Sequence, residues 1–220
     1  MREKLLCILT VLPFLANAQT SGKPSLKWAA PTKHSLAFKI SIPEGNFLYL
    51  NKGHEYGNAF GFLGISGGAE YYFSDKYNIN IDAGVLTDFM LPFPAPVDHM
   101  GDYQRSFAAY TDIQVGTDLK RFHIDAGFQY HKTSYYERET VELFPDYIDT
   151  LKYSKQQDNL GLAFSTYFRI TRSFNAGFNY YPAFINLGNK PGETHYGHLL
   201  FLELIFRIRA YTPGKDRTGL

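Results

Sequence analysis

Apolar and polar side chains alternate with a period of two in eight separate stretches of the chain. In the first stretch, Leu36, Phe38 and Ile40 share one face, while the residues between them are small or polar. The eight stretches cover residues 35–42, 63–73, 77–85, 107–119, 122–131, 159–170, 174–181 and 200–209. A period of two is typical of β-strands that have two unlike faces. The pattern therefore predicts eight strands, and no later stretch is apolar for long enough to predict a membrane-spanning helix.

The expected connections between these strands alternate in length. Long loops are expected over residues 43–58, 91–105, 135–158 and 182–197, and short turns at 74–76, 120–121 and 171–173. Bacterial membrane barrels combine short periplasmic turns with long outer loops. The sequence thus predicts an all-β fold: an eight-stranded antiparallel up-and-down transmembrane β-barrel with short periplasmic turns and long extracellular loops. An even number of strands puts both of its ends in the periplasm.

The third expected loop supports two interpretations. Alternation continues from residue 135 to residue 153, around a probable turn at Pro145 and Asp146. One interpretation is a hairpin that projects above the membrane and offers aromatic side chains to a partner, and the other is that these side chains pack the barrel mouth. The aromatic residues concerned are Tyr135, Tyr136, Phe144 and Tyr147.

A short repeat follows each expected turn. An aromatic residue and then an Asp-Ala-Gly or Asn-Ala-Gly step occur with Tyr77, Phe122 and Phe174. The aromatic residues are expected in the periplasmic girdle, and the glycines 84, 127 and 177 are expected to relieve crowding inside a narrow barrel.

A soluble lipocalin-like barrel or a β-sandwich would also alternate. Such folds turn the apolar face inward, so alternation alone does not orient the strands. The polar face here carries glycines and charges of both signs, and aromatic residues make up 17% of the chain. Both features favour a membrane barrel with aromatic girdles.

The N-terminal residues have the order of a secretory signal peptide. Arg2 and Lys4 precede an apolar stretch, and small residues lead to an expected cleavage between Ala18 and Gln19. We therefore expect a signal peptide over 1–18, a periplasmic segment over 19–32, the barrel over 33–211 and a periplasmic tail over 212–220. The single cysteine, Cys7, lies in the signal peptide, which excludes disulfides from the mature chain. Lys plus Arg number 22 against 21 for Asp plus Glu, so no nucleic-acid partner is expected.

With these features, the chain from about Lys33 to Tyr211 resembles the small eight-stranded outer-membrane barrels, the class that includes the transmembrane domain of OmpA and OmpX. The resemblance is one of architecture. It implies outer-membrane lipid and lipopolysaccharide as surroundings and the barrel-assembly machinery as a partner during biogenesis, while a surface partner is not identified. Such barrels usually end on an aromatic residue, whereas here Tyr211 is followed by nine further residues, and Phe206 and Tyr211 are candidates for an internal assembly signal.

Ten charged residues fall on the face expected to point inward. They are Lys39, Glu70, Asp82, Asp112, Asp118, Asp125, Arg169, Glu203, Arg207 and Arg209. Side chains fill the interior of an eight-stranded barrel, and buried charges are costly unless they are paired. We therefore expect an ion-pair network in which Lys39 lies beside Glu203 and Arg207; the alternative is a narrow pore or small-ion path.

Catalysis, a cofactor and a metal site are not expected. The alternative is a lipid A hydrolase, for which His131, Thr133, Ser134 and Glu137 or Glu139 are the nearest local match, although no nucleophile motif accompanies them. His198 is expected at the outer rim as an ordinary interface residue. The function predicted from the sequence is that of an integral outer-membrane barrel with a structural or surface-interaction role.

Overall fold

The computed structural model describes residues 32–51, 56–88, 103–119, 121–144, 147–171, 173–187 and 196–211. The predicted signal peptide, its cleavage site, most of the periplasmic segment and the C-terminal tail lie outside these residues. No helix within them is long and apolar enough to cross a membrane.

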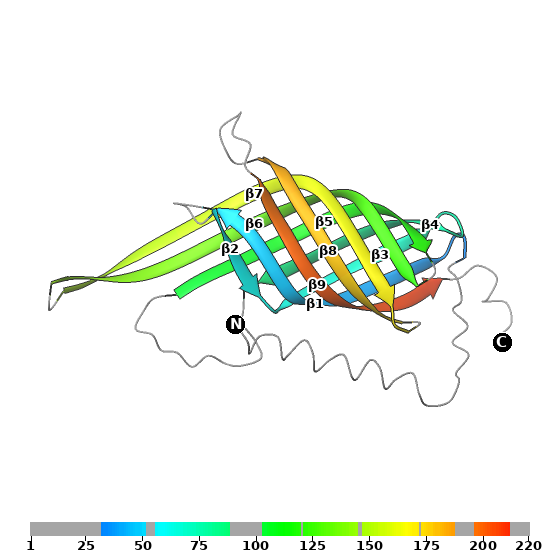
Figure 1. Cartoon of the computed structure of the whole chain (residues 1–220), viewed down its shortest axis with the longest axis horizontal. Helices are drawn as coiled ribbons and strands as arrows, with labels where there is room; N and C mark the ends of the chain where they lie inside the picture. The colour runs from blue at the N-terminus through cyan, green and yellow to red at the C-terminus, as the bar shows by residue number, and fades with distance from the viewer. Residues whose placement is uncertain are drawn as a thin grey trace, which may run out of the picture.

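Nine antiparallel strands form one closed, up-and-down barrel (Figure 1). They are β1 (Leu36–Asn51), β2 (Tyr56–Gly61), β3 (Gly64–Tyr72), β4 (Tyr77–Thr87), β5 (Tyr103–Leu119), β6 (Phe122–Phe144), β7 (Tyr147–Arg169), β8 (Phe174–Asn186) and β9 (Gly197–Tyr211). Pairing of β1 with β9 closes the ring. Since β2 and β3 lie end to end along the same side of β1, the ring is eight strands wide, and the predicted all-β up-and-down barrel is confirmed.

The loop expected over residues 43–58 is wrong. Strand β1 continues to Asn51, and β2 returns along it from Tyr56. Pro43 suggested an end to the strand because proline lacks the N–H that a sheet requires. In the structure Pro43 instead lies at an irregularity between two paired halves of β1, a position where proline is tolerated.

That irregularity is a β-bulge, and it reverses the inward face of β1. Pro43 is opposite Glu203 and Gly45 is opposite Leu202, so Glu44 is one extra residue on β1. The inward residues before the bulge have odd numbers, and those after it, including Leu48 and Leu50, have even numbers. The two halves of β1 therefore contribute different kinds of side chain to the barrel interior.

The apolar face of the barrel points outward. Phe128 is 69% exposed and Ile65 is 60% exposed, whereas their polar strand neighbours Gln129 and Ser66 are buried. A lipocalin-like barrel or a sandwich would bury the apolar face instead. The soluble alternatives are therefore wrong for this chain.

The aromatic residues that follow the short turns lie together with aromatic residues of the neighbouring strands. The ring of Phe122 is 5.2 Å from that of Phe168, and the ring of Phe174 is 5.1 Å from that of Phe206. Tyr77 stacks on the Phe73 ring across the turn at residues 74–76. This end of the barrel thus carries the expected aromatic belt.

Close packing explains the glycine of the repeat on β4. A Cβ atom on Gly84 would lie 2.5 Å from Cβ of Ser66 and 2.8 Å from the phenol ring of Tyr110. A side chain at this position would displace one of these neighbours, as the sequence repeat predicted.

Strands β6 and β7 form the projecting hairpin that was one interpretation of residues 135–158. Each has 23 residues, and they remain paired as far as Phe144 and Tyr147. Strand β5 pairs with β6 only up to Arg138, and β8 pairs with β7 only up to Asn159. Figure 1 shows this hairpin extending to the left, beyond the ends of the other strands.

Candidate functional site

The barrel interior near the short turns holds a charged cluster around Glu70. The Glu70 carboxylate is fully buried and accepts hydrogen bonds from Arg207 Nε at 2.7 Å and from the Tyr167 hydroxyl at 2.9 Å. Lys39 Nζ lies 2.7 Å from Asp82 Oδ2 and 3.9 Å from Glu70 Oε1. Strands β1, β3, β4, β7 and β9 thus meet through these five side chains, and the pairing offsets the cost of burying these charges.

A second group of charges lies on β5, β6 and β7. Arg169 donates a hydrogen bond to Asp118, and the two ring nitrogens of His123 face Asp118 and Asp125. The His123 ring also stacks on Tyr167, with centroids 4.4 Å apart. Since Tyr167 also contacts Glu70, the two charged groups are continuous.

The remaining predicted charges lie nearer the middle of the barrel. Asp112 accepts hydrogen bonds from the Tyr181 hydroxyl at 2.7 Å and from Gln114 at 2.8 Å. Glu203 accepts hydrogen bonds from Ser41 and from Asn179.

The expected neighbours of Lys39 are only partly those that the structure shows. Lys39 is opposite Arg207 in the register of β1 and β9, but its ion partners are Asp82 and Glu70 rather than Glu203. In the same register Glu203 is opposite Pro43, four residues along β9 from Arg207, and its carboxylate accepts a hydrogen bond from Ser41 instead. Arg209 has a backbone position opposite Ala37, and its side chain lies outside the described residues.

Carboxylates outnumber permanent cations in this interior. Among the described residues of the two charged groups and the middle of the barrel, the acids are Glu70, Asp82, Asp112, Asp118, Asp125 and Glu203, and the permanent cations are Lys39, Arg169 and Arg207. Tyrosine hydroxyls, serines and amide groups supply the other hydrogen bonds to these acids. No group of three His, Cys, Asp or Glu side chains suited to a metal ion occurs in the described part of the chain.

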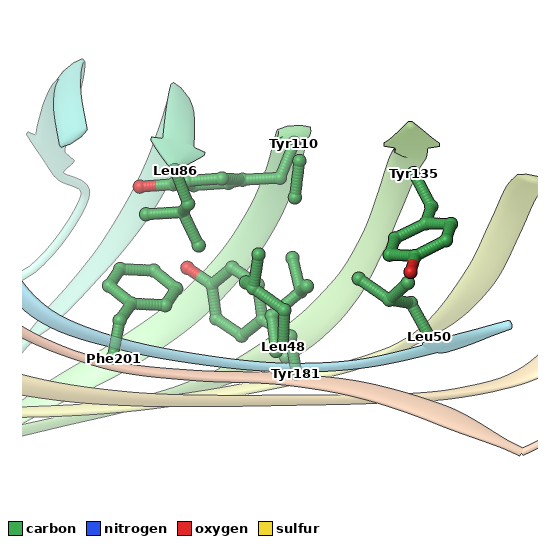
Figure 2. Close-up of a cluster of buried hydrophobic side chains, with 10 residues drawn as sticks. Leu48, Leu50, Leu86, Tyr110, Tyr135, Tyr181 and Phe201 are labelled. Carbon is green, nitrogen blue, oxygen red and sulfur yellow. The ribbon is translucent and has the colours of Figure 1, made fainter. Parts of the chain in front are cut away.

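An apolar layer separates the charged interior from the loop end of the barrel (Figure 2). Its described members are Leu48, Leu50, Leu86, Ala108, Tyr110, Tyr135, Ala163, Tyr181, Leu199 and Phe201. The rings of Tyr110, Tyr181 and Phe201 lie 5.2 to 5.4 Å apart in pairs. All ten side chains are buried, so this layer packs closely across the lumen, and the polar His131, Thr133 and Asn159 are buried at the same level on β6 and β7.

Sequence analysis missed this layer because residues 43–58 were expected to form a loop, and the bulge in β1 conceals the inward face of this segment. Leu48 and Leu50 have the same even parity as Phe38 and Ile40, which point outward, so an uninterrupted strand would place all four on the lipid-facing side. The segment Pro43-Glu44-Gly45 was the available signal, since proline and glycine within a strand often mark a bulge.

The structure does not bring the hydrolase candidates together. His131 is buried and faces Gln129 Oε1 at 2.9 Å, whereas Ser134 lies on the opposite face of β6. Thr133 is buried on the inward face, and Glu137 accepts a hydrogen bond from Gln104 near the barrel mouth. The side chain of Glu139 lies outside the described residues.

His198 belongs to an aromatic group on the outward face of the loop end. Its ring stacks on Tyr49 at 5.3 Å and lies 5.4 Å from the Tyr196 ring. Tyr196 in turn shares a hydrogen bond of 2.6 Å with the Tyr180 hydroxyl. This aromatic group covers β1, β8 and β9, which agrees with the expected rim position of His198.

No family model matches the chain, and no curated protein matches it. Among solved structures, Ail, the attachment invasion locus protein of Yersinia pestis, is similar over 80% of this chain and 100% of its own, at 9% identity and a TM-score of 0.47. Neisserial surface protein A is similar over 79% of this chain and 96% of its own, at 10% identity and a TM-score of 0.45. The N-terminal β-barrel domain of Pseudomonas aeruginosa OprF covers 80% of this chain and 98% of its own, at 10% identity and a TM-score of 0.36. These likenesses concern the fold alone.

Proposed function

We propose that this chain is an integral outer-membrane β-barrel that does not conduct and that presents its β6–β7 hairpin outside the membrane as an interaction surface. The main support for the membrane placement is the outward apolar face. One row across three neighbouring strands consists of the exposed side chains Phe128, Ile113 and Leu162. Exposure of such an apolar band to water around a whole barrel would be energetically unfavourable.

The length of β6 and β7 supports the interaction role. A membrane-spanning strand needs about 9–11 residues, and β3 and β4 have 9 and 11. Strands β6 and β7 have 23 each, so about half of this hairpin extends beyond the hydrocarbon region. Crossing the membrane does not require this extra length, and a paired ribbon is a rigid support for surface contacts.

The apolar layer argues against the alternative of a narrow pore. A permeating ion would lose its hydration among Leu48, Tyr181 and Phe201, and hydrocarbon cannot replace that hydration. We therefore expect planar bilayers containing the protein to show no steady channel activity.

Fractionation with surface proteolysis tests the proposal. We expect the chain in the outer-membrane fraction, with heat-modifiable migration on a gel. Trypsin added to intact cells should cleave at Lys152 or Lys155 on the hairpin and leave Lys76 at the turn end uncut. Recovery in a soluble fraction would contradict the membrane placement, while cleavage at Lys76 with a protected hairpin would contradict the orientation.

A further inference from the structure

Four basic residues lie on the outward face of β5, β6 and β7, directly beyond the apolar band. We name this set the basic face; it consists of Arg105, Lys132, Arg138 and Lys152. The Arg105 and Lys152 side chains are exposed, and Lys132 is 44% exposed. On the described outward positions of this segment the one acid is Asp158, which lies 4.0 Å from Lys132.

Two of these cations oppose each other, with no acid among the described outward side chains beside them. Arg138 and Lys152 are direct register partners on β6 and β7, and like charges placed opposite each other destabilise a strand pair. An anionic group held between these two side chains would remove the repulsion.

Within the described residues, the basic face lies on one side of the barrel. At the loop end of β1, β8 and β9, the outward side chains are the uncharged aromatic group of Tyr49, Tyr180, Phe184 and Tyr196, together with His198. That arrangement is the usual interfacial belt. The basic face on β5 to β7 differs from this belt because its side chains are charged and because it extends farther from the apolar band.

The distance that the basic face spans along the membrane normal decides which anionic lipid can contact all of it. Lys132 is four residues from Phe128 in the apolar band, and Arg138 is six residues farther along β6. Six residues span about 20 Å of strand, or about 15 Å along the membrane normal at a tilt of roughly 40°. A phospholipid headgroup region is only about 5–8 Å thick. A phospholipid at the Lys132 level therefore cannot reach Arg138 or Lys152.

We propose that the basic face binds lipopolysaccharide from the surrounding outer leaflet. Its acyl chains lie along the exposed row of Ile113, Phe128 and Leu162, and its phosphate and carboxylate groups extend upward from Lys132 to the Arg138–Lys152 pair. This binding site rests on the membrane placement proposed above.

Surface plasmon resonance on the full mature chain tests the binding site. The barrel is held in phosphatidylcholine nanodiscs and titrated with rough lipopolysaccharide, with phosphatidylglycerol vesicles and with a soluble sulfated polysaccharide. The test variant carries Arg138→Gln and Lys152→Gln. The matched control carries Lys76→Gln and Arg121→Gln, which remove the same charge from exposed residues at the turn end.

Lipopolysaccharide should bind the native barrel more tightly than the other two ligands, and 0.5 M NaCl should weaken binding. The test variant should bind it about 20- to 30-fold more weakly, because each basic residue near an anionic surface contributes roughly a factor of five. The control should stay within about twofold, and the single Lys152→Gln variant should show about a fivefold loss.

Equal binding by the test variant, or equally tight binding of the soluble polysaccharide, would overturn the proposal. Heat-modifiable migration is measured on every preparation. A native chain that lacks it would instead contradict the membrane barrel itself, so the two failures are distinguishable.

Discussion

Replacing Glu70 with alanine should strongly destabilise the barrel. The Glu70 carboxylate is the partner of the Arg207 guanidinium, whose side chain is only 3% exposed and which lies 2.6 Å away, and it also accepts the Tyr167 hydroxyl. Removing one member of a buried ion pair costs about 3–5 kcal/mol, because the other charge stays buried without compensation. The equilibrium constant for unfolding should therefore rise between about 100-fold and 4,000-fold.

The measurement is a urea titration of the barrel in detergent micelles, followed by circular dichroism and by heat-modifiable migration. Glu44→Ala is the control, since Glu44 is exposed, and it should change the free energy of unfolding by less than about 0.5 kcal/mol. The double variant Glu70→Leu with Arg207→Met should recover most of the loss, because it removes both charges and keeps volume. A Glu70→Ala barrel within about 1 kcal/mol of the native one would refute the reasoning.

Three further changes address Glu203, the apolar layer and the β6–β7 hairpin. Glu203→Ala should lower heat resistance in detergent, with a loss of about 1.5–3 kcal/mol in the free energy of unfolding. The loss is smaller than for Glu70 because the change removes charge-assisted hydrogen bonds from Ser41 and Asn179 rather than an ion pair. An unchanged melting profile would count against this contact. Leu48→Ala should cost about 2–5 kcal/mol by leaving a cavity in the apolar layer, and planar-bilayer recordings of Leu48→Ala combined with Phe201→Ala should show transient openings that the native barrel lacks. Replacing residues 141–149 with a two-residue Asn-Gly turn should leave the barrel's heat-modifiable migration intact, since those residues pair only within the β6–β7 hairpin; a barrel that then fails to form would show that the hairpin contributes to folding.

The alternation of side chains was enough to predict most of the barrel. It gave the inward and outward faces of β3 to β7 and β9, and of β8 as far as Ala183, since these stretches keep one parity along their described length inside the barrel; a register shift then turns both Phe184 and Ile185 of β8 outward. Lys39, Glu70 and Arg207 were expected in the interior for the same reason, and the structure places them among the buried residues. Pairwise partners were harder to predict, because they depend on the stagger between strands, which single-strand periodicity does not contain.

The apolar layer could not be predicted from periodicity alone, because one inserted residue changes the parity of everything that follows it. Glu44 has this effect on β1, and the break between Gly61 and Gly64 has a matching effect on the partner strand. The packing of Pro43 against Gly64 accompanies both changes, since a Cβ on Gly64 would lie 2.9 Å from the proline ring.

Because of this bulge, the inward faces of the two halves of β1 can change independently of each other. Deleting Glu44 would leave the faces of residues 36–42 as they are and exchange the faces of residues 46–51, which would turn Leu48 and Leu50 toward lipid and Phe47 and Tyr49 into the lumen. The insertion or deletion of one residue here during evolution would therefore change which β1 side chains line the lumen above the charged cluster. The cluster itself would not be altered. The same position could be used in protein design to replace Leu48 and Leu50 in the lumen by Phe47 and Tyr49. The charged lower half of the barrel would stay unchanged and support the fold.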